Sequence, residues 1–219
     1  MYGDAFTGSL SSAEAAQVSA SSKNAVDVTF NAGVQGKITF LEDGIFRYSV
    51  DPTGEFSAYA AARNEGHVAR IQAQPDTSDA FAKPSATVKD VGSAFEISGN
   101  VTVVLEKATD KPSIKAGGKL VMQESAPLEI GADTTVQRVV KNEDENYFGG
   151  GTQNGRFIHT GNSINIVNEG SWVDGGVASP NPFYWSTDGY GVLHNTFAEG
   201  ECDFGKADAN GVLATHNDS

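Results

Sequence analysis

Apolar and polar residues alternate over many short stretches of the chain, which is the period of a half-buried β-strand. The alternation is clear at residues 25–30, and it recurs over residues 37–50 on both sides of Asp43-Gly44. Asp-Gly between two such runs favours a two-residue hairpin turn, because both turn positions need positive φ. The pattern therefore predicts an antiparallel β-hairpin early in the chain.

Further short runs of the same kind follow, separated by turn-forming residues. Residues 57–84 break the pattern, and we expect a long connection there with one irregular strand at residues 68–71. Residues 10–20 are rich in Ala and Ser and fit a short helix or an ordered arm. Many short strands without a sustained helical period predict an all-β, two-sheet antiparallel β-sandwich with little helix. The additional predicted strands are residues 87–89, 94–98, 101–105, 113–115, 119–123 and 134–140.

The composition of the chain limits the classes of molecule that this sandwich is expected to bind. A chain of 219 residues can bury a core without disulfides, and its single cysteine, Cys202, is expected to be a buried or half-buried thiol. The net charge of −13 argues against nucleic acid and anionic membranes as partners, whereas neutral sugars are compatible with it. No apolar run approaches the ~20 residues of a membrane helix, and no signal segment is recognisable, so the compartment stays open. No pattern predicts a cofactor or metal site, since Asp208-x-Asn210-Gly211 is too short for a calcium loop.

Candidate chemistry concentrates between Tyr147 and Thr196, a stretch that holds both tryptophans and the densest glycines. Gly149-Gly150-Gly151 allows backbone angles that a side chain forbids, and it lets another group approach the main chain closely. A tight turn between two strands is the other interpretation of these glycines. The donors that follow, Gln153, Asn154 and Arg156, are neutral or planar and suit sugar hydroxyls.

Two segments of this stretch resemble a known family. The first is Tyr147-Phe148-Gly149-Gly150-Gly151. The second, which is longer and more specific, is Pro182-Phe183-Tyr184-x-Ser186-x-x-Gly189-Tyr190-Gly191-x-x-x-Asn195-Thr196. Together they are similar to the amino-terminal, galactose-mutarotase-like β-sandwich domain of glycoside hydrolase family 31, the α-glucosidase family. Many members carry Trp-Asn-x-Asp in the loop between the segments, where this chain has Asn168-Glu169-Gly170 and then Asp174. This departure leaves α-galactosides and α-N-acetylgalactosaminides open as substrates beside α-glucosides.

The resemblance implies a role in α-glycoside hydrolysis that the chain does not perform alone. The family is retaining and uses two aspartates of a (β/α)8 barrel that follows the sandwich, and no position of this sequence matches those catalytic residues. We therefore expect a non-catalytic domain whose partner is the catalytic barrel of the same polypeptide. In the family the intervening loop reaches toward that barrel and helps wall the substrate pocket, with an aromatic ring against the sugar and a carboxylate on its hydroxyls. The expected substrate-binding set is Trp172, Asp174, Asn168, Glu169, Gln153, Asn154 and Arg156.

The resemblance also sets the expected domain limits. Residues 1–205 are predicted to be the β-sandwich, and residues 206–219 a hairpin and tail that lead toward a closing strand and the barrel. Residues 212–215 would then form an uncovered sheet edge, which tends to recruit another chain. We expect a soluble domain that dimerises through this edge.

Two other functions stay open. A free-standing carbohydrate-binding module would keep Trp172 and Asp174 but would bind sugar without a barrel. An aldose-epimerase-like enzyme would use a His and a Glu to open sugar rings, with His159 or His194 as the acid, because imidazole titrates near neutrality. No mutarotase signature accompanies either histidine, and His194 lies inside the second family-like segment.

Overall fold

The computed structural model describes residues 16–56, 82–167, 170, 173, 176–196 and 198–217. Every regular element in these ranges is a β-strand, and the sheets are antiparallel, which confirms the all-β prediction. The predicted strand at residues 68–71 lies outside the described residues, as do the candidate site residues Asn168, Glu169, Trp172 and Asp174. The part of the chain that the structure describes holds no helix capable of spanning a bilayer.

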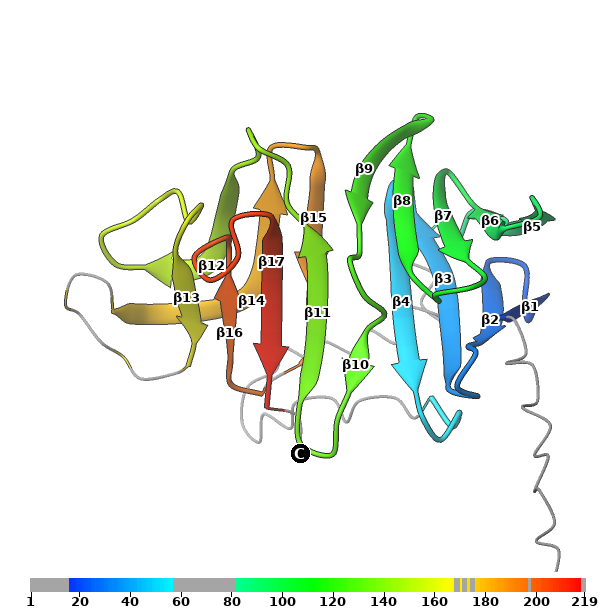
Figure 1. The fold of residues 1–219 in the computed structure, drawn as a ribbon, viewed down its shortest axis with the longest axis horizontal. Coiled ribbons are helices and arrows are strands. Elements are labelled where there is room, and N and C mark those ends of the chain that lie inside the picture. The colour runs from blue at the N-terminus through cyan, green and yellow to red at the C-terminus, as the bar shows by residue number, and fades with distance from the viewer. Residues whose placement is uncertain are drawn as a thin grey trace, which may run out of the picture.

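The first nine strands form one half of the molecule, built from two sheets (Figure 1). One sheet has the strand order β1-β2-β3-β4 and the other the order β5-β6-β7-β8-β9. Strand β1 occupies the described end of the Ala/Ser-rich stretch, so the helical alternative is wrong there. The bounds are β1 Gln17–Ala20, β2 Ala25–Thr29, β3 Gln35–Glu42, β4 Ile45–Asp51, β5 Thr87–Asp90, β6 Ala94–Ser98, β7 Val101–Glu106, β8 Pro112–Ala116 and β9 Lys119–Gln123.

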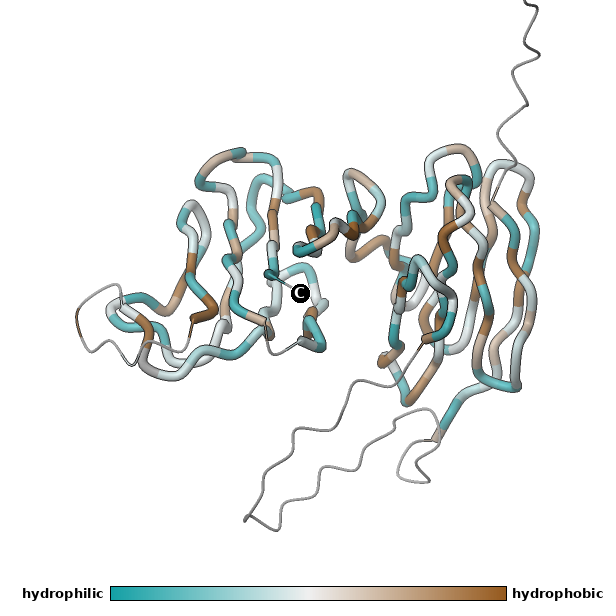
Figure 2. The backbone as a smooth tube through the Cα atoms, turned by 90° about the horizontal axis from the view of Figure 1, so that it is seen from below, coloured by the Kyte–Doolittle hydropathy of each residue, from teal (hydrophilic) through white to brown (hydrophobic). Residues whose placement is uncertain are grey.

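The predicted turn at Asp43-Gly44 joins β3 to β4, and Gly44 adopts the expected positive φ of 72°. Apolar side chains from both sheets then meet in a shared core, where Phe40 of β3 packs with Ile97 of β6 and Leu105 of β7. Phe40 is completely buried, which is worth about 2–3 kcal/mol relative to an exposed ring. Figure 2 shows the resulting apolar segments along the strands of this half. The apolar positions of the alternating sequence pattern are thus the ones that face this core.

The remaining strands form a second half, again from two sheets, with orders β10-β11-β17-β16-β13 and β12-β14-β15. Its core is aromatic: the ring centroids of Tyr147, Tyr184 and Phe204 lie 5.1 to 6.1 Å apart. Cys202 is buried in the same cluster, as predicted. The bounds are β10 Glu129–Ile130, β11 Thr135–Val140, β12 Tyr147–Gln153, β13 Ser163–Ile166, β14 Val177–Ser186, β15 Tyr190–Leu193, β16 Gly200–Asp203 and β17 Gly211–His216.

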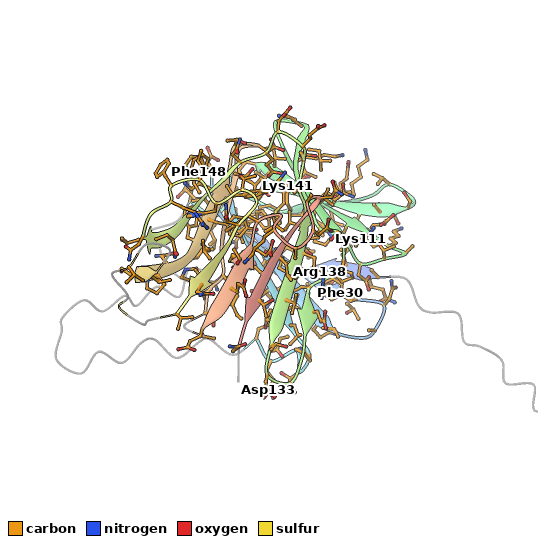
Figure 3. All side chains as sticks on the ribbon, turned by 60° about the vertical axis from the view of Figure 1, so that its left-hand side comes forward. Phe30, Lys111, Asp133, Arg138, Lys141 and Phe148 are labelled. Carbon is orange, nitrogen blue, oxygen red and sulfur yellow. The ribbon has the colours of Figure 1, made fainter. Side chains whose placement is uncertain are left out.

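The two halves meet between β9 and β11, which lie side by side in the middle of the molecule (Figure 1). A β-bridge pairs Glu124 with Val139, and the Ser125 N–H donates to the Arg138 carbonyl at 3.0 Å. Arg138 of β11 is labelled in Figure 3, above the turn that carries Asp133. We call this junction the seam. This bridge and this backbone hydrogen bond connect the five-stranded sheets of the two halves.

Strand β17 is an interior strand, which corrects the expected open edge. It pairs with β11 on one side and with β16 on the other. The prediction of an uncovered edge at residues 212–215 is therefore wrong, and the predicted dimer through that edge loses its basis. Residues 211–216 form β17 within the five-stranded sheet of the second half. The partner β11 lies far earlier in the chain, so no local pattern around β17 indicated it.

Candidate functional site

The three consecutive glycines lie within strand β12, not in a turn, so the turn interpretation is wrong. All three have positive φ, at 112°, 72° and 75° for Gly149, Gly150 and Gly151. A Cβ on Gly149 would lie 2.5 Å from the Phe183 carbonyl oxygen, and one on Gly151 would lie 2.2 Å from the Ser179 carbonyl oxygen. The register of β12 against β14 shifts between Gly149 and Gly151. Glycine is needed here because the backbone of β14 approaches so closely.

The carbonyls of this glycine segment hold two polar side chains in place. Gln153 Nε2 donates to the Gly150 carbonyl at 2.7 Å, and His159 Nε2 lies 3.0 Å from the Gly149 carbonyl. The His159 Nε2 must carry the ring proton, because a carbonyl oxygen can only accept. Burial lowers the pKa of His159, and nearby Arg156 lowers it further, against the raising effect of the bond to Gly149. His159 is thus a neutral, buried ring that stacks on Phe204, and it is poorly suited to act as an acid.

The structure brings Gln153, Asn154 and Arg156 to one open surface pocket. Sequence reasoning missed Ser163 and Asn165, which reach the same pocket from β13. No motif marked them, since they are ordinary polar positions of a strand. The lining is dominated by amide, hydroxyl and guanidinium groups, which suits a neutral, hydroxyl-rich ligand. The full lining is Gln153, Asn154, Arg156, His159, Ser163, Ile164 and Asn165.

The pocket lies beside the two ends of the segment 167–176, which contains the other candidate residues. Strand β13 leads into residues 167–176 from one side of the pocket. On the other side the Asn154 N–H donates to the Gly176 carbonyl at 3.0 Å, and Gln153 pairs with Val177 at the start of β14. Both stems of this segment therefore border the pocket. The stems are described by the structure, whereas Asn168, Glu169, Trp172 and Asp174 lie outside the described residues.

Large apolar side chains are exposed on the three-stranded sheet β12-β14-β15 and the loop after β12. The Phe148 and Trp185 rings, which are cross-strand partners, stack with centroids 4.3 Å apart, and Phe157 packs edge-on against Phe148 at 5.3 Å. Phe148 is labelled in Figure 3. Phe157 is 77% exposed and Trp185 is 41% exposed. We call this surface the aromatic face; its members are Phe148, Phe157, Phe183, Trp185 and Leu193.

A separate polar cluster lies at the seam and contains the other histidine of the epimerase alternative. His194 Nε2 lies 2.9 Å from Gln137 Oε1, and Gln137 Nε2 donates to Glu124 Oε1 at 2.8 Å. A histidine and a glutamate are thus joined through one amide. Glu124 is buried, however, so a sugar ring could reach it only if the fold opened. Among the described residues, no group of three or more His, Cys, Asp or Glu side chains is arranged to hold a metal ion.

Residues 35–203 match the family described as the glycosyl hydrolase 31 N-terminal galactose mutarotase-like domain. The chain belongs to this family. The match covers most of the described sandwich, from β3 to β16, and it confirms the resemblance inferred from the two segments around the glycines and the second tryptophan. A comparison with curated proteins found no match.

Solved enzyme structures share the fold, and the dextranase and the α-xylosidase among those below belong to glycoside hydrolase family 31. A dextranase from Flavobacterium johnsoniae, complexed with glucose, matches with a TM-score of 0.74 at 17% identity, over 94% of this chain and 25% of the enzyme. The cycloalternan-forming enzyme from Listeria monocytogenes matches with a TM-score of 0.70 at 13% identity, over 92% of this chain and 19% of that one. An α-xylosidase from a soil metagenome matches with a TM-score of 0.64 at 17% identity, over 92% and 32%. The chain thus spans between a fifth and a third of the length of these enzymes.

Proposed function

We propose that this chain is the non-catalytic N-terminal domain of a family 31 α-glycosidase, in which residues 167–176 help wall the substrate pocket of a (β/α)8 catalytic barrel. The observation that carries the proposal is the pocket at the root of this segment. It gathers Gln153, Asn154 and Arg156, which are the donors that the sequence singled out, beside both stems. Hydrogen-bond donors around an open polar pocket suit the hydroxyls of an α-glycoside.

The barrel is proposed as part of the same polypeptide. The family's two catalytic aspartates have no counterpart in this sequence. In each of the three enzymes above, most of the polypeptide lies outside the region that matches this chain. Those three enzymes carry different names, as a dextranase, a cycloalternan-forming enzyme and an α-xylosidase, so family membership alone does not select the substrate. We keep both an α-glucosidase-like and an α-galactosidase- or α-N-acetylgalactosaminidase-like activity.

The aromatic face supports a docking partner beside this pocket. It follows the same strands, β12 and β14, that border the pocket, and a stacked tryptophan and phenylalanine in contact with water indicate a surface that packs elsewhere. We propose that the aromatic face packs against the barrel and so holds the 167–176 segment over the catalytic site.

The proposal is tested by removing Trp172 in the full-length enzyme. Covering roughly 80 Å² of the indole with sugar, at ~25 cal/mol/Å², is worth about 2 kcal/mol, so Trp172→Ala should lower kcat/KM about 30-fold. Val173→Ala is the matched control, because Val173 is an exposed residue of the same segment. Equal kcat/KM values for wild type and Trp172→Ala would contradict the proposal.

The isolated chain provides a second test. Without a barrel it should not turn over aryl α-glucosides, α-galactosides or α-N-acetylgalactosaminides. Steady turnover that co-purifies with the chain would contradict the non-catalytic assignment.

A free-standing carbohydrate-binding module is the second candidate, because the polar pocket is formed within this chain alone. This candidate requires the isolated chain to bind an α-glycoside in a calorimetric titration, and Arg156→Ala to weaken that binding. The pocket-wall proposal requires the barrel for binding.

A further inference from the structure

Glu124 lies at the seam, directly after β9, and its backbone bridges to Val139 of β11. Its side chain is only 2% exposed, although carboxyl groups are rarely buried without a charged partner. Because the seam is where the two halves of the domain join, the protonation state of this group bears on how firmly they are held together.

One oxygen of the Glu124 side chain has a hydrogen bond and the other has none. Gln137 Nε2 donates to Oε1 at 2.8 Å, whereas Oε2 is buried without a hydrogen-bond partner among the described residues. On the far side of the amide, His194 Nε2 donates to Gln137 Oε1 at 2.9 Å. A carboxylate has room for about four hydrogen bonds, so one neutral donor offsets little of the cost of burying its charge.

The groups that face Glu124 supply no fixed positive charge. Tyr48 of β4 and Tyr184 of β14 lie within electrostatic reach of it, and Asp110, in the loop before β8, acts on the same Tyr48. The His216 ring of β17 packs 4.7 Å from the His194 ring, and two imidazoles so close are costly to charge together. Within the described part of the chain, these facing groups are phenols, imidazoles, an amide and an acid rather than lysine or arginine.

Burial raises the pKa of Glu124 to about 7, against the lowering effect of the Gln137 hydrogen bond. In the unfolded chain the same group titrates near its ordinary value of 4.5. Between these two pH values the folded chain keeps a proton that the unfolded chain has released. The Glu124 contribution to stability therefore falls as pH rises through this window, and it stays at the lower level above it.

We propose that Glu124 is a proton-operated latch between the two halves of the domain. The protonated carboxyl is a neutral group, so it fits the buried seam without the cost of burying a charge. The ionised carboxyl is a buried charge with one hydrogen bond, and the seam opens locally so that water reaches it. A change of pH near neutrality then alters how firmly the half with the pocket and the aromatic face is held on the other half.

The first test compares melting temperatures of wild type and Glu124→Gln from pH 5 to pH 7.5. Glutamine resembles the protonated acid but does not ionise, so wild type should lose stability as pH rises whereas the variant should not lose it at this site. The melting temperature of the variant minus that of wild type should therefore increase by roughly 5–10 °C from pH 5 to pH 7.5. Glu145→Gln is the matched control. Glu145 is equally buried, but both of its carboxyl oxygens accept hydrogen bonds, one from the Asn142 N–H and one from the Ser186 hydroxyl. A constant difference between Glu124→Gln and wild type, or the same rise in Glu145→Gln, would overturn the latch.

The second test uses wild type alone, so it stands even if the variant fails to fold. The Ser125 N–H donates across the seam to Arg138, and its hydrogen exchange therefore reports opening of the seam. After correction for intrinsic exchange, protection of Ser125 should fall about tenfold between pH 6 and pH 8, while Ala214 in the interior strand β17 keeps its protection. Protection of Ser125 that is constant with pH would overturn the proposal.

Discussion

The two halves of this domain are both antiparallel β-sandwiches, yet they are built differently. The buried cluster of the first half is made of aliphatic and phenylalanine side chains, such as Val26, Phe40 and Leu105, with the half-buried Tyr48 packed against it. The core of the second half stacks Tyr147 and Tyr184, whose hydroxyl groups need partners in a buried site, around Phe204. Both halves bury some polar groups, but only the second half has tyrosines inside its buried cluster and three consecutive positive-φ glycines inside a strand, among the residues that the structure describes.

This difference coincides with the placement of the candidate site. The glycine segment, the pocket, the stems of residues 167–176 and the aromatic face all belong to the second half. Strained backbone and buried polar groups persist where the surrounding structure determines them strongly, and they often accompany functional sites.

The largest expected effect comes from adding a methyl group to the glycine segment. Gly151→Ala places a Cβ 2.2 Å from the Ser179 carbonyl oxygen at φ of 75°, so we expect the second half to fold poorly and the melting temperature to drop by more than ~10 °C. Gly161→Ala is the matched control, because Gly161 has the same φ of 75° with no atom within 4 Å of the added group. It should cost about 1–2 kcal/mol. Equal losses in calorimetric melting would show that the backbone angle, not the close approach of β14, requires glycine.

Truncation in the apolar core should come next in size. Phe40→Ala removes a completely buried ring and should cost about 3–5 kcal/mol, whereas Ile45→Ala, on the exposed side of the same hairpin, should change stability by less than ~0.5 kcal/mol. Chemical denaturation measures both. If the halves form one cooperative unit, the single transition shifts as a whole. Two transitions, with only the first displaced, would show that the halves unfold separately.

A smaller effect is expected from His159, and its pH dependence is opposite to that of Glu124. Burial keeps the pKa of His159 below its ordinary value of 6.5, so the unfolded chain takes up a proton below about pH 6.5 that the folded chain resists. The stability that His159 contributes is therefore present above this pH and is lost as pH falls. Below pH 6.5, the free energy of unfolding should fall less steeply with decreasing pH for His159→Gln than for wild type, as measured by chemical denaturation at several pH values. Equal slopes for the two proteins would show that the pKa of His159 is not lowered in the folded chain.

The aromatic face should show the smallest effect on the isolated chain. The stacked pair of Phe148 and Trp185 is partly exposed, so a double-mutant cycle with alanine at both positions should give a coupling of about 0.5–1.5 kcal/mol. In the full-length enzyme the same variants should lose more, because the proposed contact with the barrel is lost as well. A coupling of equal size in both settings would remove this face from the proposed interface.

Local sequence signals were sufficient to predict most of the strands, one hairpin and the family of this protein. Alternation and Asp43-Gly44 predicted strands and the β3–β4 hairpin, because side-chain period and turn chemistry are written within a few neighbouring residues. The two motif segments likewise indicated the family and drew attention to Gln153, Asn154 and Arg156. None of these signals depended on a distant partner.

Only the tertiary structure decided what depends on distant pairing. It placed the glycine segment against the backbone of β14, made β17 an interior strand between β11 and β16, and brought Ser163 and Asn165 to the pocket. It also buried Glu124, which in sequence is one acid among many. Pairing partners and burial arise from contacts between residues far apart in the chain, so the same local pattern fits an edge or an interior strand, and an exposed or a buried acid.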